Sequence, residues 1–224
     1  MDGNGRWAKK RRKPRTAGHA AGEAALMDTL EGALEIGVGW LTVFAFSTEN
    51  WRRPAGEVRF LMNFNERLLL RRREELIERG VRVRTIGRRP GRIPKRLVRR
   101  MEETEALTAR NKALELTFAF DYGGRAEIVD ATKRIAAEVV AGKLDPSRIT
   151  DRTIARHLYD PQMPDPDLLI RTSGEFRLSN FLLWESAYTE LFFTPVLWPD
   201  FRREHLDEAI REYQRRERRY GKVR

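Results

Sequence analysis

The strongest constraint on the fold is a repeated alternation of helix-patterned and strand-patterned apolar segments along the chain. Apolar residues at helical spacing over 26–37 precede the β-rich run 40–46, and the same order recurs at 58–77 and 81–86. Glycines follow both helical patterns and are expected to end them. Strands that alternate with helices form a mostly parallel sheet with helices on its faces, joined by right-handed crossovers. The sequence therefore predicts an α/β fold.

The alternation continues to the end of the chain. Further helices are expected at about 94–110, 128–139, 154–159 and 206–213, and further strands at 114–120, 168–170 and 190–194. No internal repeat, linker or compositional break divides these segments, so one domain over residues 1–224 is expected. In a parallel sheet, ligands bind at the carboxyl ends of the strands. We therefore expect the chemistry in the loops at 47–53, 121–125 and 171–179.

Composition excludes several classes of protein. The 224 residues include no cysteine, which excludes disulfides, thiolate zinc sites and cysteine nucleophiles and suits a reducing cytoplasm. No apolar run approaches the roughly 18 residues that a membrane span needs, and no signal-like segment is present near Met1. The 44 Lys and Arg against 33 Asp and Glu give a net charge of +11. Such a charge suits an anionic ligand or an anionic surface.

The opening segment combines two glycines with an acid and an arginine. Gly3 and Gly5 let backbone N–H groups approach a ligand closely, with Asp2 on one side and Arg6 on the other. This pattern is typical of a phosphate loop, and a simple glycine turn with a solvated arginine is the alternative. The segment also matches a dinucleotide-binding pattern, but no strand precedes it as that motif requires.

Other polar residues stand at or near expected strand ends. Residues 47–53 form a polar burst that an ordinary loop explains equally well. Arg171 and Arg177 flank a Ser-Gly turn, where their planar guanidinium groups suit bidentate phosphate binding, with solvated surface arginines as the alternative. Glu190 stands among apolar residues, where a buried acid needs a partner or a cation, unless it faces water. His19 is a lone histidine, and such residues are more often capping or surface residues than catalysts.

Together these segments resemble the cis-prenyltransferase family, also called undecaprenyl diphosphate synthases or isoprenyl transferases, from residue 1 to about 221. The resemblance rests on five motifs in the family's order: Met1–Ala8, Ala45–Trp51, Tyr122–Arg125, Pro164–Glu175 and Leu197–Phe201. The family elongates an allylic diphosphate, commonly farnesyl diphosphate, with isopentenyl diphosphate units in cis, using Mg²⁺. The resemblance thus implies a polyprenyl diphosphate product such as undecaprenyl diphosphate, a homodimer, and an apolar tunnel for the growing chain.

The resemblance also implies roles for individual residues. Asp2 and Asn50 match catalytic residues, Asp2 as an acid that helps hold Mg²⁺ on the allylic diphosphate and Asn50 as a participant in proton removal. Glu190 matches a second acid associated with Mg²⁺. The implied substrate-binding residues are Gly3, Asn4, Gly5, Arg6, Trp7, Arg15, His19, Ser47, Glu49, Trp51, Arg53, Arg171, Arg177 and Ser179. Candidate tunnel walls, for which ordinary core packing is the alternative, are Ala45, Leu61, Leu68, Leu69, Leu114 and Leu116.

The chain departs from the family pattern near its first motif. Family members usually carry a strand immediately before the acid that Asp2 matches, whereas this sequence begins one residue before it. Either the sequence is trimmed or mis-started, or the fold tolerates the loss, and the second case would leave Asp2 at a mobile terminus. Phe176 stands where a polar residue is frequent, and Glu185 where glutamine is common.

The net charge exceeds what the cations around two diphosphates explain. The basic runs Lys9–Lys13, Arg71–Arg73 and Arg215–Arg219 are expected to be solvated helix faces, some of them in peripheral contact with anionic lipid at the inner face of the membrane. Two other functions stay open. One is a non-catalytic partner subunit of a two-chain prenyltransferase. The other is a nucleic-acid binder, although the sequence has no nucleic-acid motif and the resemblance implies no such ligand.

Overall fold

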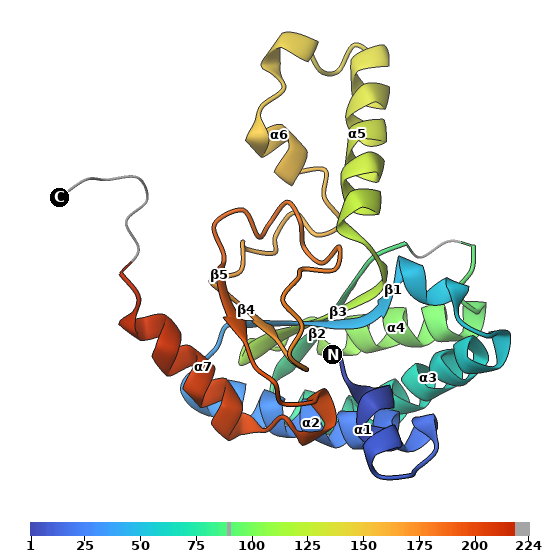
Figure 1. Ribbon diagram of the computed structural model, residues 1–224. Helices are drawn as coiled ribbons and strands as arrows, with labels where there is room; N and C mark the ends of the chain where they lie inside the picture. Colours follow the sequence, from blue (N-terminus) through green and yellow to red (C-terminus); the bar gives the residue numbers. More distant parts are fainter. Residues whose placement is uncertain (89–90, 218–224) are drawn as a thin grey trace. The chain divides into compact units, whose positions relative to one another are not determined.

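A computed structural model describes residues 1–88 and 91–217 of the chain (Figure 1). These residues gather into two compact units. Unit 1 comprises residues 1–36, 166–177 and 188 onward, and unit 2 comprises residues 37–165 and 178–187. The expected single domain over 1–224 stays a prediction. Its last residues, and part of the expected basic run Arg215–Arg219, lie outside the described residues.

Unit 2 is built on a three-stranded parallel sheet. Strands β1 (Trp40–Ser47), β2 (Val81–Ile86) and β3 (Leu114–Tyr122) lie in the order β1-β3-β2. Every residue of β3 except Glu115 is buried. Thr117 and Ala119 are buried together with their apolar neighbours, because a central parallel strand is covered on both faces.

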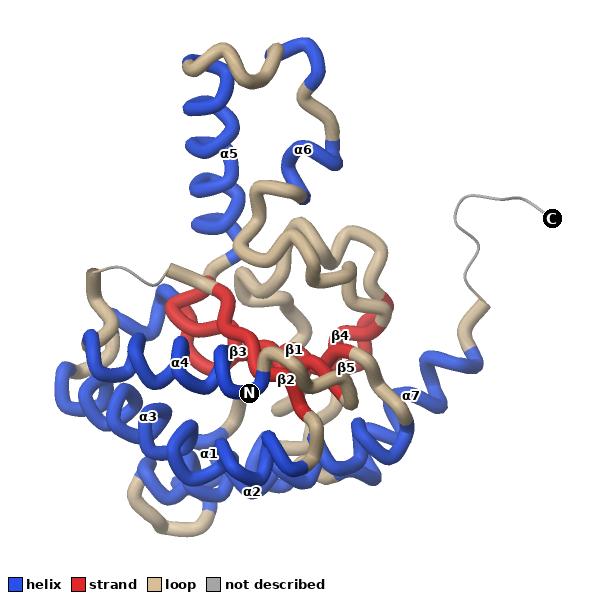
Figure 2. Tube along the Cα trace, turned by 180° about the vertical axis from the view of Figure 1, so that it is seen from behind, coloured by secondary structure: helices blue, strands red, loops and turns tan. Residues whose placement is uncertain are grey.

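Helices of unit 2 cover this sheet. Helices α3 (Ala55–Glu78) and α4 (Lys95–Thr108) lie side by side and pack on β2 (Figure 2). Their apolar residues, with those of β1 and β3, form a buried cluster that includes Phe46, Leu61, Leu69 and Phe120. Leu68, Leu114 and Leu116 are also buried. The candidate tunnel walls are therefore core residues in this structure, apart from the half-buried Ala45.

Near its start, unit 2 contains η1 (Thr48–Arg52) directly after β1. Its second half contains α5 (Gly124–Val140), the short η2 (Pro146–Arg148) and α6 (Asp151–Ala155). Helices α5 and α6 pack against each other (Figure 1). The prediction of a helix at 154–159 is wrong in its bounds. Helix α6 begins at Asp151, three residues earlier, and Thr150 caps it, with its N–H donating to Thr153 Oγ1 at 3.1 Å.

Unit 1 is built on a two-stranded parallel sheet and a helical layer. Its strands are β4 (Leu168–Arg171) and β5 (Glu190–Phe193), and its helices are α1 (Asn4–Lys10), α2 (Arg15–Ile36), η3 (Trp198–Asp200) and α7 (Arg203–Arg215). The long helix α2 packs against α1, η3 and α7. The prediction of parallel strands covered by helices is confirmed, with the strands divided between two sheets rather than placed in one. No helix in the described part of the chain is long and apolar enough to cross a membrane.

The opening segment forms a helix where the sequence predicts a loop or a turn. A helix begins at Asn4, and Gly3 caps it with φ of 103°, a conformation that favours glycine. The prediction that Lys9–Lys13 forms a helix face is wrong for its second half. The chain leaves α1 after Lys10, and the loop through Pro14 joins α1 to α2.

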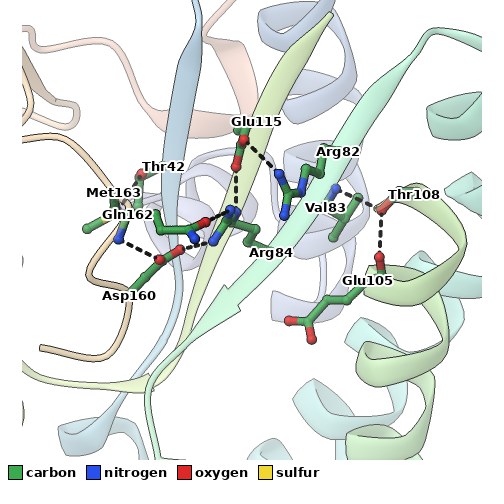
Figure 3. A network of polar contacts seen from close by, with 10 residues as sticks. All are labelled: Thr42, Arg82, Val83, Arg84, Glu105, Thr108, Glu115, Asp160, Gln162 and Met163. Atoms are coloured by element: carbon green, nitrogen blue, oxygen red, sulfur yellow. Dashed lines mark hydrogen bonds and ion pairs between the residues drawn. The ribbon is translucent and has the colours of Figure 1, made fainter. Parts of the chain in front are cut away.

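A network of charges fixes the segment after α6 to the sheet of unit 2 (Figure 3). Arg84 of β2 uses three nitrogens in this network. Its Nε donates to Glu115 Oε2 at 2.5 Å, its Nη1 to Asp160 Oδ2 at 2.7 Å, and its Nη2 to Gln162 Oε1 at 2.7 Å. All sides of this guanidinium are therefore bonded within the protein, as expected of a structural ion pair.

Candidate active site

The backbone of Asp2 is fastened by residues far away in the sequence. Its carbonyl oxygen accepts hydrogen bonds from Ser173 Oγ at 2.8 Å, from the N–H of Trp198 at 3.0 Å and from Thr172 Oγ1 at 3.2 Å. These donors come from the loop after β4 and from η3. Sequence reasoning did not assign roles to them individually, although two hydroxyl residues directly after a strand end were a visible signal. They place Asp2 at the carboxyl end of β4.

The side chain of Asp2 lies among cations. Its Oδ1 accepts from the N–H of Gly3 at 2.7 Å, and its Oδ2 accepts from Arg171 Nη2 at 2.9 Å. Arg6 Nη2 lies 3.5 Å from Oδ1. Burial alone would raise the pKa of Asp2, but Arg171, the Gly3 N–H and Arg6 together hold it below its usual value. Asp2 is therefore an ionised carboxylate at neutral pH.

A second acid links two more of the predicted arginines. Arg6 Nη1 donates to the carbonyl of Ser173 at 2.9 Å and lies 3.0 Å from Glu175 Oε1. Glu175 Oε2 pairs with Arg177 Nη1 at 2.5 Å. Glu175 thus bridges Arg6 and Arg177, a role that sequence reasoning missed. The side chain of Arg177 is 62% exposed, so its guanidinium stays accessible to a ligand.

Glycines of α2 make room for Asn4. A Cβ on Gly18 would lie 2.0 Å from the backbone oxygen of Asn4, and a Cβ on Gly22 would lie 2.7 Å from Asn4 Oδ1. The contact at Gly18 is with backbone and allows no side chain, so Gly18 is required for α1 to approach α2 this closely, whereas a side chain at Gly22 would force the Asn4 side chain to move. Their spacing of four residues along one helix face was the signal for this contact. Arg15 lies nearby, with its Nε 3.2 Å from where a Cβ of Gly5 would stand.

The buried polar atoms of unit 1 without a hydrogen-bond partner among the described residues include Asn4 Oδ1 and Arg171 Nε. A buried polar atom without a partner is costly, so such atoms are expected to meet a ligand or water. Arg171 Nε belongs to the same guanidinium that holds Asp2. The unpartnered N–H donor of Arg171 therefore lies beside the ionised Asp2.

The remaining predicted residues of unit 1 are placed as follows. Trp7 donates from Nε1 to Asp200 Oδ1 at 2.7 Å, which fixes α1 to η3. His19 is half-buried on α2, one turn after Arg15.

Glu190 is not brought to Asp2. Glu190 begins β5 and is paired in register with Leu168, whereas Arg171, which holds Asp2, is paired with Phe193. Three residues of a strand span about 10 Å. The carboxylate of Glu190 is bonded to Arg216 Nη1 at 2.8 Å. The predicted pair of Mg²⁺ ligands is therefore separated along the strands, and within the described residues no cluster of three acids or histidines could hold a metal ion alone.

In unit 2, the predicted residues gather where β1 ends. The N–H of Ser47 donates to Asn50 Oδ1 at 3.1 Å, which closes the turn into η1. Trp51 donates from Nε1 to Asp121 Oδ1 at 2.6 Å, and burial raises the pKa of Asp121. Arg53 pairs with Glu57 at 2.8 Å.

The segment that carries Ser179 is held to the same place in unit 2. Asn180 Nδ2 donates to Glu49 Oε1 at 2.9 Å, and the carbonyl of Asn180 accepts from the N–H of Gly124 at 2.7 Å. Ser179 and Asn180 both have positive φ, at 53° and 65°. Burial opposes the ionisation of Glu49, but the Asn180 hydrogen bond helps hold the pKa of Glu49 below its usual value. The turn therefore places Ser179 directly before Asn180, the residue that binds the ionised Glu49.

Comparisons with known proteins agree with these features. A family model for undecaprenyl diphosphate synthases matches residues 1–221. The chain is 58% identical over 221 residues, 99% of its length and 78% of the relative's, to the trans,polycis-polyprenyl diphosphate synthase ((2Z,6E)-farnesyl diphosphate specific) of Thermobifida fusca. It is 51% identical, over 99% of its length and 74% of the relative's, to the decaprenyl diphosphate synthase of Mycobacterium leprae.

Solved structures give the same result. The crystal structure of lavandulyl diphosphate synthase from Lavandula x intermedia, in complex with dimethylallyl diphosphate, matches with a TM-score of 0.96 and 37% identity, covering 99% of this chain and 95% of that one. A probable undecaprenyl diphosphate synthase from Campylobacter jejuni matches with a TM-score of 0.80 and 33% identity, covering 91% and 93%. With its ionised Asp2, its arginines and these relatives, the chain belongs to the undecaprenyl diphosphate synthase family of cis-prenyltransferases.

Proposed function

We propose that this protein condenses isopentenyl diphosphate with an allylic prenyl diphosphate, farnesyl diphosphate, in cis, and releases a polyprenyl diphosphate such as undecaprenyl diphosphate. The observation that carries the proposal is the ionised Asp2 held by Arg171, whose Nε is buried and without a partner among the described residues. A diphosphate oxygen would satisfy this Nε with a charge-assisted hydrogen bond.

The chemistry requires a diphosphate to leave as an anion. The allylic C–O bond breaks, the double bond of isopentenyl diphosphate forms the new C–C bond to the allylic carbon, and a proton is then lost from the isopentenyl unit. Negative charge grows on the departing diphosphate. We assign Arg6, Arg15 and the Gly3–Gly5 backbone to that charge, because fixed donors aimed at developing charge lower the barrier. Trp7 and His19 border this group of residues.

We assign Arg171, Arg177 and Ser179 to the diphosphate of isopentenyl diphosphate. Planar guanidinium groups bind two phosphate oxygens at once and stay charged throughout the working pH range. We assign Asn50 to proton removal and Ser47, Glu49, Trp51 and Arg53 to the loop that surrounds the reacting carbons. Ser47 and Asn50 share a hydrogen bond, which supports a common role at the end of β1.

The donor set around Asp2 fits a Mg²⁺ ion shared with substrate. Mg²⁺ is usually bound by one or two carboxylates together with substrate phosphates rather than by an all-protein cage. Asp2 is ionised and offers carboxylate oxygens, while its neighbours Arg6 and Arg171 are suited to phosphate. Bound there, Mg²⁺ would neutralise charge on the leaving diphosphate. Glu190 remains a proposed second acid, supported by the resemblance and not by its pairing with Arg216.

Product length, assembly and location are also part of the proposal. The names of the relatives cover decaprenyl and other polyprenyl products, so the number of added units must be measured. At about 0.8 kcal/mol per buried CH₂, an apolar tunnel would retain each five-carbon unit by roughly 3 to 4 kcal/mol, and its closed end would then set the length. We propose a cytoplasmic homodimer, consistent with the absence of cysteine, in peripheral contact with anionic membrane.

The test is an elongation assay with the purified chain, farnesyl diphosphate, radiolabelled isopentenyl diphosphate and Mg²⁺, followed by sizing of the products. We expect polyprenyl diphosphates from the wild type and none above background from Asp2→Ala, with Asp28→Ala as a control carboxylate on the same unit. Activity of the single chain excludes the non-catalytic partner subunit. An Asp2→Ala variant as fast as the wild type would contradict the mechanism.

A further inference from the structure

An open cleft lies along the loop between α1 and α2. It has a volume of about 600 Å³. Five cations line it: Arg6, Lys9, Arg12, Lys13 and Arg15. The two other lining residues carry no charge. The volume is in the range of sites that bind small molecules, and it is larger than one phosphate group requires.

Only part of the positive charge of the cleft is paired within the protein: Arg6 lies 3.0 Å from Glu175 and 3.5 Å from Asp2. The sequence between Asp2 and Glu23 contains no acid. Among the described residues, no carboxylate pairs with Lys9, Arg12 or Lys13, and all three are exposed. Cations gathered on one concave surface produce a positive potential that concentrates anions. The nearby Arg11 differs, because it is bonded to Asp200 and has a structural role.

The backbone holds these cations in a defined place. The N–H of Lys13 donates to the carbonyl of Ala8 at 2.9 Å, and the N–H of Arg12 donates to the carbonyl of Lys9 at 3.1 Å. These bonds end α1 with Arg12 at φ of 52°, a position where glycine is the usual residue. Lys13 is further placed by Trp7, with its Nζ 5.7 Å from the ring centre. The loop therefore presents Arg12 and Lys13 in an ordered turn.

We propose that this cleft is a binding site for a diphosphate anion, in which Lys9, Arg12 and Lys13 form a second wall that receives the pyrophosphate released in each elongation cycle. The inference rests on the proposed function, which assigns Arg6 and Arg15 to the allylic diphosphate. These two arginines also line the cleft, and none of its lining residues is acidic, so an anion that leaves them meets the second wall next. Each cation can then pass the leaving group outward before the next allylic diphosphate binds.

Calorimetric titration of the full chain with inorganic pyrophosphate tests the site directly. We expect the triple variant Lys9→Gln, Arg12→Gln, Lys13→Gln to bind pyrophosphate at least tenfold more weakly than the wild type, with a loss that grows smaller at high salt. In the elongation assay the same variant should show a pyrophosphate inhibition constant raised by a similar factor. Its kcat at low pyrophosphate should stay within about threefold, since the residues that hold the reacting substrates are intact.

A matched control separates local binding from total charge. Lys143→Gln, Arg148→Gln, Arg152→Gln removes the same charge from exposed residues of unit 2 and should leave the affinity for pyrophosphate unchanged. Equal weakening by both triple variants, or no weakening by the cleft variant, would overturn the proposal. Thermal melting verifies that each variant is folded.

Two further experiments distinguish free pyrophosphate from a lipid headgroup as the ligand, and the cleft from the proposed function. Sedimentation with phosphatidylglycerol vesicles should show no difference between the wild type and the cleft variant. A variant that loses vesicle binding but keeps its affinity for pyrophosphate would assign the loop to a lipid surface and overturn the site. If wild-type protein binds pyrophosphate through Lys9, Arg12 and Lys13 but elongates nothing, the cleft stands and the proposed function fails.

Discussion

Two arginines of equal burial show how differently this molecule uses the same side chain. The side chains of Arg171 in unit 1 and Arg84 in unit 2 are 15% and 16% exposed, and each pairs with carboxylate. Arg84 donates from Nε, Nη1 and Nη2 to three different side chains. Arg171 donates from Nη2 to Asp2, while its buried Nε has no hydrogen-bond partner in the described part of the chain.

The difference lies in bonding capacity rather than in burial or charge. A guanidinium with all three nitrogens bonded inside the protein has little left for a ligand, and removing it leaves half-buried carboxylates with fewer partners. A guanidinium with an unused buried donor is costly to the fold and is best explained by a ligand that completes it. Arg84 should therefore matter for stability, and Arg171 for activity.

The largest expected effect is on catalysis. Arg171→Met should lower kcat/KM for elongation by about 10³-fold, because it removes donors to the substrate and the partner that holds Asp2. The free energy of unfolding should change by less than about 1 kcal/mol, since Asp2 keeps the Gly3 N–H and Arg6 and is partly exposed. Steady-state kinetics and urea unfolding measure the two effects. A variant that is mainly unstable and not mainly slow would reverse the comparison.

The opposite pattern is expected for Arg84→Met. This substitution leaves Asp160 without its arginine and leaves Glu115 with Arg82 alone. It should lower the free energy of unfolding by about 3 kcal/mol, with the activity per folded molecule unchanged. The control is Arg82→Met. Arg82 contacts the same Glu115 at 3.3 Å but is 33% exposed, so its loss should cost less than about 1 kcal/mol. If Arg84→Met and Arg82→Met lowered the free energy of unfolding equally, the number of hydrogen bonds that an arginine makes would not predict its contribution to stability.

Sequence patterns found the elements that bury apolar residues and missed those fixed by tertiary contacts. Strand β2 was predicted with its observed bounds, because a run of β-branched residues after a glycine is a strong local signal. For helix α1, only a helix face at Lys9–Lys13 was predicted, and the helical residues before Lys9 were missed. This helix has only seven residues, too few to be stable alone, and depends on the approach to α2 that Gly18 and Gly22 allow.

The candidate site divides in the same way. The resemblance supplied Asp2, Arg6, Arg171 and Arg177, and the structure brings these together in unit 1. It did not supply the bridging role of Glu175, because that contact joins residues 169 apart in the chain. Local patterns carry no information about such a pairing.

A carboxylate with no arginine bonded to it extends the comparison. Glu185 is 3% exposed and lies beside Glu127, which accepts hydrogen bonds from the Tyr122 hydroxyl and from the N–H of Tyr159. Burial and the neighbouring Glu127 raise the pKa of Glu185 to about 8. Whereas Asp2 is ionised at neutral pH, Glu185 therefore stays protonated in the folded protein.

The sign of the pH dependence follows from this pKa. The folded state keeps a proton on Glu185 up to about pH 8, while the unfolded chain loses it near its ordinary value of 4.5. Between these values the folded state binds more protons, so this contribution to stability decreases as pH rises and is lost above about pH 8. At pH 9, Glu185→Gln should raise the melting temperature by about 5 °C relative to the wild type. The control is Glu102→Gln, at an exposed position. If the difference in melting temperature between Glu185→Gln and the wild type did not grow with pH, the raised pKa of Glu185 would be contradicted.

The smallest expected effect concerns the loop that ends α1. Arg12 adopts φ of 52°, which is unfavourable for a residue with a side chain, so Arg12→Gly should raise the free energy of unfolding by about 0.5 to 1 kcal/mol. The same change removes a cation from the cleft and should weaken pyrophosphate binding. Urea unfolding and calorimetric titration of one variant therefore measure both consequences. A higher free energy of unfolding together with weaker pyrophosphate binding would show that Arg12, like Arg171, serves a ligand at a cost to the fold. A lower free energy of unfolding would instead place Arg12 with Arg84 as a structural residue.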